Sequence, residues 1–338
     1  MSILNVEHLS HGFGDRAIFH DVSFRLLKGE HIGLIGANGE GKSTFMNIIT
    51  GRLQPDEGKV EWSKNVRAGY LDQHTALEKG MTIRQVLTSA FDFLLDMEQE
   101  LNGIYEKMGE ADEDTMQQLM EDAGTLQELL TAHDFYMIDS KVEEVGRALG
   151  LSEVGLDKDV SELSGGQRTK VLLGKLLLEK PDILLLDEPT NGLDPAGIQE
   201  MRSLIAAMPQ TTGATVLISS HLLGEIEQMV DQVGILNHGK LLFEGSLQQL
   251  QKHSRGGILL RVLDAPNAAA VLQQQGVKAD TLADQPDTLQ LPPLPDEALA
   301  ALVCTLAERG VGVVGLTAQT KSLEDIFLSL TQTSGEVA

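Results

Sequence analysis

A glycine-rich stretch that ends in a lysine and two hydroxyl side chains is the clearest chemical feature of this sequence. From Gly36 to Ser43 it fits the spacing G-x-x-x-x-G-K-[ST]. The glycines let successive backbone N–H groups converge on a phosphate, and the following helix points its positive end at the same anion. We therefore expect Lys42 to reach the β- and γ-phosphates of a nucleotide and Ser43 to bind Mg²⁺. A glycine-rich turn that binds nothing would have the same composition.

A second chemical cluster is a pair of carboxylates at the end of an aliphatic run. Residues 183–186 are Ile-Leu-Leu-Leu, and Asp187 and Glu188 follow directly. This pattern predicts a buried parallel strand that delivers acids to its carboxyl end. Asp187 suits Mg²⁺, directly or through water, and Glu188 suits a general base that polarises an attacking water. Such a strand also occurs with a purely structural role, but beside a phosphate loop it favours a nucleotide site.

Strands and helices that could position these clusters are readable around them. An apolar run at 31–35 precedes the phosphate loop, and residues 45–49 leave it at helical spacing. Alternating or β-rich runs predict strands at 3–10, 17–19, 22–24, 59–62 and 66–71. Phe13 stands between two glycines near the first strand, where it could stack on a purine or pack in the core. His8, His11 and His20 have no supporting cysteine or further histidine, and we interpret them as surface residues.

The segment after the first strands predicts a long helical hairpin. Thr82 and Gln85 have the form of a capping box. Apolar residues then recur at three- and four-residue steps from 83 to 108, which predicts one helix, and a second periodic run covers 116–130 beyond the acidic turn at 110–114. Between residues 96 and 147 there are 15 acidic and three basic side chains, so the hairpin is acidic. A solvated structural insertion would look the same.

Bulk composition excludes several classes of protein. The 338 residues carry a formal net charge of −24, which disfavours nucleic acid, and no direct DNA binding is expected. With a single cysteine, Cys304, no intramolecular disulfide can form. No apolar run approaches the ~18 residues of a membrane span, and the first residues do not resemble a signal peptide. We expect a cytoplasmic protein that acts at a membrane only through a partner.

A third motif lies between the two chemical clusters. Residues 163–167, Leu-Ser-Gly-Gly-Gln, stand directly before an amphipathic run. Small residues at a helix start can bring a hydroxyl and several N–H groups against an anion. This motif therefore predicts a second phosphate-contacting segment.

The order of the motifs resembles that of ATP-binding cassette (ABC) ATPases. They match that family's Walker A, Q-loop, signature motif, Walker B, D-loop and switch histidine at residues 36–44, Gln73, 163–167, 183–188, 191–194 and His221. The resemblance covers roughly residues 1–250. It implies an α/β P-loop cassette at 1–253, with a helical subdomain that bears the hairpin at about 82–131. A small C-terminal accessory α/β domain is expected at 254–338.

The resemblance also implies roles for individual residues. Nucleotide contacts are implied for Phe13, Gly36, Asn38, Gly39, Gly41, Lys42, Ser43, Thr44, Ser164, Gly165, Gly166, Gln167 and Asp194. Catalytic roles are implied for Lys42, Gln73, Glu188 and His221, and Mg²⁺ ligation for Ser43, Gln73 and Asp187. Two cassettes would pack head to tail, so that Ser164 and Gly166 touch the γ-phosphate of ATP bound by the other copy.

Two kinds of ABC protein are resembled by different parts of the chain. Residues 1–191 are similar to a cassette of the ABC-F group, soluble factors that act on the ribosome, and residues 192–338 are similar to ATP-binding subunits of bacterial exporters. The expected function is therefore ATP hydrolysis by a nucleotide-sandwich homodimer that energises a membrane exporter through a permease at the inner face of the cell membrane. An ABC-F-like ATPase with the ribosome as partner is the alternative.

Overall fold

The computed structural model describes residues 2–72, 75, 77–109, 111–253, 255–282, 285–320 and 326–328. The chain divides into two compact units, Met1–Glu244 and Gly245–Ala338. The border expected from the sequence, between 253 and 254, lies slightly later in the chain. Gln73, the predicted Q-loop glutamine, falls outside the described residues.

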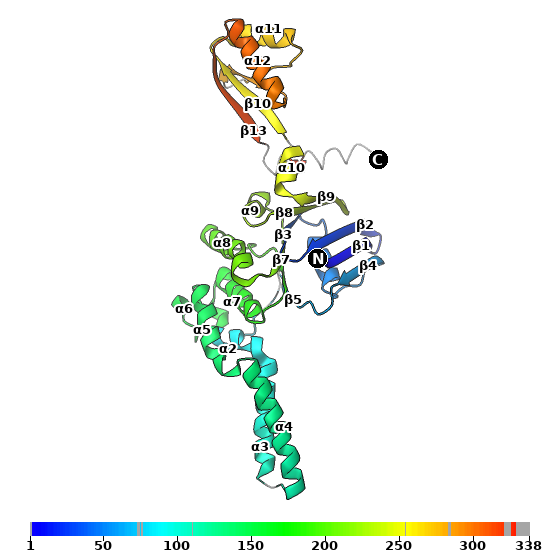
Figure 1. Ribbon diagram of the computed structural model, residues 1–338, viewed down its shortest axis with the longest axis vertical. Helices are drawn as coiled ribbons and strands as arrows, with labels where there is room; N and C mark the ends of the chain where they lie inside the picture. The colour runs from blue at the N-terminus through cyan, green and yellow to red at the C-terminus, as the bar shows by residue number, and fades with distance from the viewer. Residues whose placement is uncertain are drawn as a thin grey trace. The chain divides into compact units, whose positions relative to one another are not determined.

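A six-stranded, mainly parallel sheet forms the centre of the first unit (Figure 1). Its order is β5 (Ala68–Leu71), β6 (Ile183–Asp187), β7 (Thr215–Ser220), β3 (His31–Ile35), β8 (Gln232–Asn237) and β9 (Lys240–Ser246). Every residue of β3, β6 and β7 is buried, which agrees with the aliphatic residues at the centre of each sequence. The strands are parallel, with Ile35 opposite Ser220 and Asp187 opposite Ser219, so their carboxyl ends meet at one edge.

A three-stranded antiparallel sheet lies beside it, in the order β2 (Arg16–Leu27), β1 (Ser2–Phe13) and β4 (Glu57–Trp62). Helix α1 (Lys42–Ile49) shares a hydrophobic core with both sheets through Phe45, Met46 and Ile49. Strand β1 continues to Phe13, beyond the predicted end at residue 10. The interpretation of His11 as a surface residue is wrong: it is only 7% exposed, because it lies on the same buried side of β1 as Leu9.

The helices of the first unit include those of the helical subdomain. They are α2 (Ile83–Thr88), α3 (Asp92–Met108), α4 (Glu113–Ala132), α5 (Ile138–Ala148), α6 (Leu151–Val154), α7 (Gly165–Leu178), α8 (Pro195–Thr212) and α9 (Leu223–Ile226). The capping box at Thr82 is confirmed, with Gln85 N donating to Thr82 Oγ1 at 3.2 Å. The single helix predicted over 83–108 is wrong, because a 3₁₀ turn at Ser89–Phe91 separates α2 from α3. There Ser89 Oγ donates to Val86 O at 2.7 Å, and the turn buries two consecutive side chains, Ala90 and Phe91.

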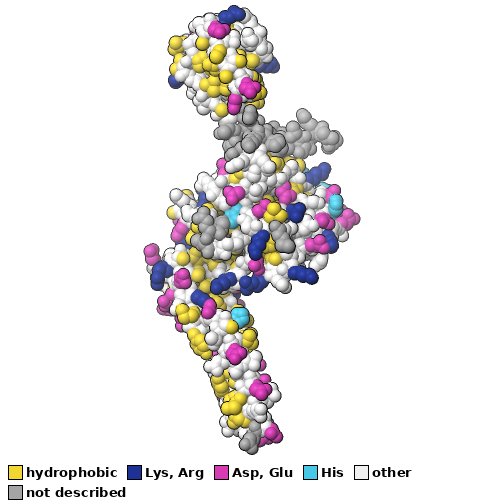
Figure 2. All heavy atoms as spheres, viewed as in Figure 1, with side chains coloured by type: hydrophobic (Ala, Val, Ile, Leu, Met, Phe, Trp, Pro, Cys, Tyr) yellow, Lys and Arg dark blue, Asp and Glu magenta, His cyan; other side chains and the backbone are white. Residues whose placement is uncertain are grey.

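The predicted hairpin is present and consists of α3 and α4 (Figure 1). Its seam is apolar and contains Leu94, Leu101, Ile104, Ala123 and Leu130. Met120, which the periodic pattern assigns to the seam, is 63% exposed. The neighbouring Leu119 packs against the hydrophobic core instead. Figure 2 shows hydrophobic side chains along one side of the hairpin.

The second unit has its own sheet and core. The sheet order is β11 (Asp280–Leu282), β12 (Gln285–Leu291), β10 (Arg255–Val262) and β13 (Val313–Thr320). Helices α11 (Ala265–Gln274) and α12 (Asp296–Glu308) bury Leu272 and Leu306 in that core, and α10 (Leu247–His253) precedes it. In the described part of the chain, no helix combines the length and the apolar character needed to cross a membrane.

Candidate nucleotide site

The phosphate loop lies between β3 and α1, and its glycines are required by space. Gly41 is the N-cap of α1 with φ 93°, and a Cβ at this position would lie 2.6 Å from Ile18 Cγ2. A Cβ on Gly36 would lie 2.9 Å from the carbonyl oxygen of Leu236. A side chain at either position would displace the loop, so the loop's path depends on glycine.

Lys42 is buried under this loop and is held by three oxygen atoms. Its side chain is 4% exposed, and Nζ donates to Gly36 O at 2.9 Å and to Ala37 O at 3.2 Å. Nζ also lies 3.1 Å from Oε1 of Glu188, which comes from the end of β6. The loop lysine and the candidate general base therefore form an ion pair, and a bound phosphate would have to share Lys42 with that carboxylate.

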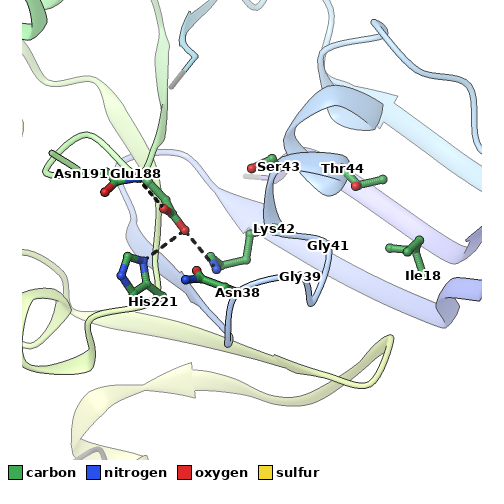
Figure 3. A pocket seen from close by; sticks show the side chains of 10 residues that line it. All are labelled: Ile18, Asn38, Gly39, Gly41, Lys42, Ser43, Thr44, Glu188, Asn191 and His221. Atoms are coloured by element: carbon green, nitrogen blue, oxygen red, sulfur yellow. Dashed lines mark hydrogen bonds and ion pairs between the residues drawn. The ribbon is translucent and has the colours of Figure 1, made fainter. Parts of the chain in front are cut away.

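Glu188 is placed by an uncommon backbone conformation. Its φ is 48°, in the left-handed region that non-glycine residues seldom adopt. Residues held in this conformation cluster at functional sites. Its N–H donates to Ser219 Oγ at 3.0 Å and to Ser219 O at 3.2 Å, which anchors the turn to β7. The carboxylate then points between Lys42 and His221 (Figure 3), with His221 Nδ1 3.3 Å from Oε1. Although these two atoms are close, His221 Nδ1 forms no hydrogen bond with any residue that the structure describes.

Asp187 is buried at the last position of β6. Ser219 Oγ donates to its Oδ1 at 2.5 Å. Burial, and after it the nearby Asp187 carboxylate, raises the pKa of Tyr70, so that phenol stays neutral. Asp187 and the exposed hydroxyl of Ser43 are the hard oxygen donors that Mg²⁺ prefers. Among the residues the structure describes, no cluster of three or more His, Cys, Asp or Glu could hold a metal, and Gln73, the third predicted Mg²⁺ ligand, lies outside them.

A cavity of about 420 Å³ lies between the phosphate loop, Glu188 and His221 (Figure 3). Its lining contains eight residues predicted from the sequence: Asn38, Gly39, Gly41, Lys42, Ser43, Thr44, Glu188 and His221. Two lining residues, Ile18 and Asn191, were given no role from the sequence. Asn191 Nδ2 donates to Glu188 Oε2 at 3.4 Å, and its place in the D-loop motif, three residues after Glu188, was the available signal. Ser219, just before the switch histidine, was missed in the same way.

Other predicted residues lie outside this cavity. Ser164 caps α7 in a capping box with Gln167, and Gly165 lines an adjoining cavity of about 250 Å³ that also contains Asp187 and Glu188. Gly166 lines neither of these cavities. Asp194 accepts a hydrogen bond from Gly197 N at 2.9 Å at the start of α8.

Gly36 lies beneath the loop as an acceptor for Lys42, outside the cavity lining. Phe13 ends β1 and is 54% exposed, which excludes the alternative of a core phenylalanine. It does not line the cavity, although Ile18 from the neighbouring strand does.

Comparisons with known proteins identify the family of the chain. The family model described as ABC transporter matches residues 19–191. The chain is 68% identical over 219 residues to the uncharacterized ABC transporter ATP-binding protein YfmM of Bacillus subtilis, covering 65% of this chain and 42% of that protein. It is 27% identical over 337 residues to the bacitracin transport ATP-binding protein BcrA of Bacillus licheniformis, covering 97% of both. ABC transporter F family member 2 of Arabidopsis thaliana is 30% identical over 250 residues, which are 73% of this chain and 36% of that protein.

Solved structures show the same architecture. An ATP-binding cassette of an ABC transporter, MJ1267, matches with a TM-score of 0.54 and 25% identity, covering 73% of this chain and 92% of that one. An ATP-binding subunit of an ABC transporter gives a TM-score of 0.55 at 24% identity, covering 74% and 92%. The predicted α/β cassette fold is confirmed, and the chain belongs to the ABC transporter family of ATP-binding proteins.

Proposed function

We propose that this chain binds Mg-ATP in the cavity beside the phosphate loop and hydrolyses it to ADP and phosphate. The observation that carries the proposal is the Glu188 carboxylate, held 3.1 Å from Lys42 Nζ and 3.3 Å from His221 Nδ1 at the mouth of the loop. Lys42 would bind the β- and γ-phosphates, and Glu188 would accept a proton from water attacking the γ-phosphorus. His221 would hold the γ-phosphate and that water. Magnesium, with Ser43 and Asp187 as ligands, would neutralise charge on the phosphate oxygens.

We further propose that two copies of the chain share each ATP. Ser164 and Gly166 lie at the start of α7, outside the cavity that contains Lys42. A helix N-terminus with its hydroxyl and N–H groups suits an anion, and a second copy would supply the phosphate it contacts. Hydrolysis would remove those shared contacts and let the dimer open. One copy alone therefore has half of each site.

The proposed role in the cell is to energise a membrane exporter. Support comes from BcrA, a bacitracin transport protein that aligns with nearly the whole chain. The alternative is an ABC-F-like factor on the ribosome, supported by the α3–α4 hairpin and by relatives named as F family members. The acidic charge of the hairpin weighs against a surface that lies on RNA.

The activity is tested by phosphate release from ATP with and without Mg²⁺. We expect Mg-dependent turnover, with ATP binding and turnover lost in Lys42→Ala and preserved in Lys64→Ala, an exposed lysine in the loop after β4. Equal turnover in Lys42→Ala and the unsubstituted chain would contradict the proposal.

The cellular role is tested separately by the protein's partners. A permease that co-purifies from membranes and stimulates the ATPase supports the exporter. Salt-sensitive cosedimentation with ribosomes, without such a permease, supports the alternative and contradicts the exporter.

A further inference from the structure

The exposed ring of Phe13 rests on a buried ring. Phe13 and His11 have ring centroids 4.9 Å apart at an interplanar angle of 87°, the edge-to-face arrangement that aromatic pairs favour. The His11 side chain is almost completely buried, whereas more than half of Phe13 faces solvent. The fixed imidazole therefore restricts how the exposed phenyl ring can turn.

The nitrogens of His11 do not explain its position. Neither Nδ1 nor Nε2 has a hydrogen-bond partner among the described residues. Asp56 Oδ2 lies 3.4 Å from Nδ1, but that oxygen accepts its hydrogen bond from the backbone N–H of Gly12 at 2.8 Å. An aliphatic side chain would fill the space without the cost of unpaired nitrogens, but it could not present a flat ring to Phe13.

The same carboxylate fixes the backbone between the two rings. Asp56 also donates its own N–H to Ser10 O at 3.1 Å, so the turn before β4 is tied to β1 on both sides of His11. Gly12 is confined as well, since a Cβ there would lie 2.9 Å from Arg16 O. The segment that carries Phe13 is therefore held by several contacts within the sheet.

This segment also adjoins the phosphate loop. Phe13 is paired with Arg16 across the β1–β2 turn, and Arg16 Nη2 donates to Gly39 O at 3.3 Å. Ile18, two residues farther along β2, lines the nucleotide cavity. Phe13 is thus linked to the phosphate loop through its strand partner.

We propose that His11 is a positioning residue for Phe13, holding the phenyl ring in the orientation that stacks on the adenine of bound ATP, with Asp56 fixing the backbone between them. This inference rests on the proposed function, that the cavity binds ATP. It assigns His11 to recognition of the base and gives it no contact with the triphosphate. Loss of His11 should therefore weaken the binding of ATP and leave the binding of an adenine-free polyphosphate unchanged.

The test is calorimetric titration with two probes, Mg-ATP and magnesium tripolyphosphate. Phe13→Ala should weaken the affinity for ATP by about 5- to 150-fold, the range for loss of one aromatic stack on a base. His11→Ala should weaken the affinity for ATP by about 2- to 12-fold, the range for loss of one aromatic pair. The double variant should bind no more weakly than Phe13→Ala, because His11 acts through that ring. Tripolyphosphate affinity should be the same in every variant.

Two further variants separate positioning from a fold defect. His11→Phe keeps a ring edge against Phe13 and should bind ATP like the unsubstituted chain. His8→Asn is the matched control on the same strand and should change neither affinity, since His8 contacts Asp21 on the surface. The inference is overturned if His11→Ala binds ATP as tightly as the unsubstituted chain, or if it loses as much affinity for tripolyphosphate as for ATP. It is also overturned if His11→Phe and His11→Ala lose the same affinity for ATP. If the unsubstituted chain binds neither probe, the proposed function itself fails.

Discussion

Replacing Glu188 by glutamine separates the electrostatic and catalytic roles of its carboxylate. The charges of Lys42 and Glu188 are 3.1 Å apart and both side chains are largely buried, at 4% and 11% exposed. At an effective dielectric constant of about 20, their attraction is about 5 kcal/mol, most of which is offset by the loss of hydration. Lys42 keeps its two carbonyl acceptors, so we expect the free energy of unfolding to fall by about 1–3 kcal/mol, or roughly 2–10 °C in Tm.

Mg-ATP should reverse that loss. Its phosphates would replace the missing negative charge beside Lys42, so ATP should raise the Tm of Glu188→Gln more than that of the unsubstituted chain. Without the general base, turnover should fall by about 10²- to 10⁴-fold. The variant should then accumulate as an ATP-bound dimer on size-exclusion chromatography.

The assay is thermal unfolding and phosphate release, with and without Mg-ATP. Glu227→Gln, at an exposed position after α9, is the matched control and should behave like the unsubstituted chain. The reasoning is refuted if Glu188→Gln hydrolyses ATP at the unsubstituted rate, or if ATP stabilises the two proteins equally and no dimer forms.

Three further substitutions test the supports of the site. Gly41→Ala should lower the free energy of unfolding by about 1–2 kcal/mol, because alanine is strained in the left-handed conformation. It should also abolish Mg-ATP binding in calorimetry, because the new Cβ would lie 2.6 Å from Ile18 Cγ2. Unchanged binding would contradict the steric argument. Ser219→Ala removes the hydroxyl that bonds Asp187 and the backbone of Glu188, and it should lower both kcat and the free energy of unfolding, the latter by about 1–3 kcal/mol. Ser220→Ala, on the same strand, should leave kcat unchanged. Equal effects of the two substitutions on kcat would argue that Ser219 does not position these two residues. Burial lowers the pKa of His31 from 6.5, so the unfolded chain takes up a proton first and the free energy of unfolding falls as the pH drops through 6.5. His31→Gln removes this pH-dependent part of the free energy of unfolding. In urea titrations, the difference in free energy of unfolding between His31→Gln and the unsubstituted chain should therefore shrink as the pH is lowered. A difference independent of pH would contradict the burial argument.

Much of the site could be predicted from sequence because its parts are local. The phosphate loop needs a strand, glycines and a helix in immediate succession, and residues 31–49 carry all three. The buried strand β6 is visible as four aliphatic residues before its carboxylates. The hairpin follows from helical periodicity.

The interactions that join these parts could not be predicted. Lys42, Glu188 and His221 come from three separate βα connections, and only the sheet order brings them together. The 3₁₀ turn at Ser89–Phe91 was missed because apolar spacing continues across it. Likewise, His8 and His11 lie on the same strand, and only the face that each occupies in the folded sheet makes His8 exposed and His11 buried.

The sequence resembles two kinds of ABC protein, before and after residue 191, and this pattern did not indicate that the two segments contact each other extensively. Residues before position 191 contact later ones throughout the first unit. Gly29 N donates to Thr215 Oγ1 at 2.9 Å, and Glu40 of the phosphate loop accepts from the N–H of His238 in the turn after β8. Ser219 on β7 donates to the carboxylate of Asp187 and accepts from the backbone N–H of Glu188. The candidate site is therefore built by both parts together.

Mixing two inactive variants tests the shared site most directly. Lys42→Ala lacks the phosphate-binding lysine, and Gly166→Asp places a carboxylate at the start of α7, where it would repel a partner's phosphate. Each variant alone should be inactive. Because random pairing makes about half of the dimers mixed, and each mixed dimer has one intact site, an equimolar mixture should recover about one quarter of the unsubstituted ATPase rate if the sites work independently. A mixture as inactive as its components, or a Gly166→Asp chain that turns over ATP normally, would contradict a nucleotide site shared between two copies.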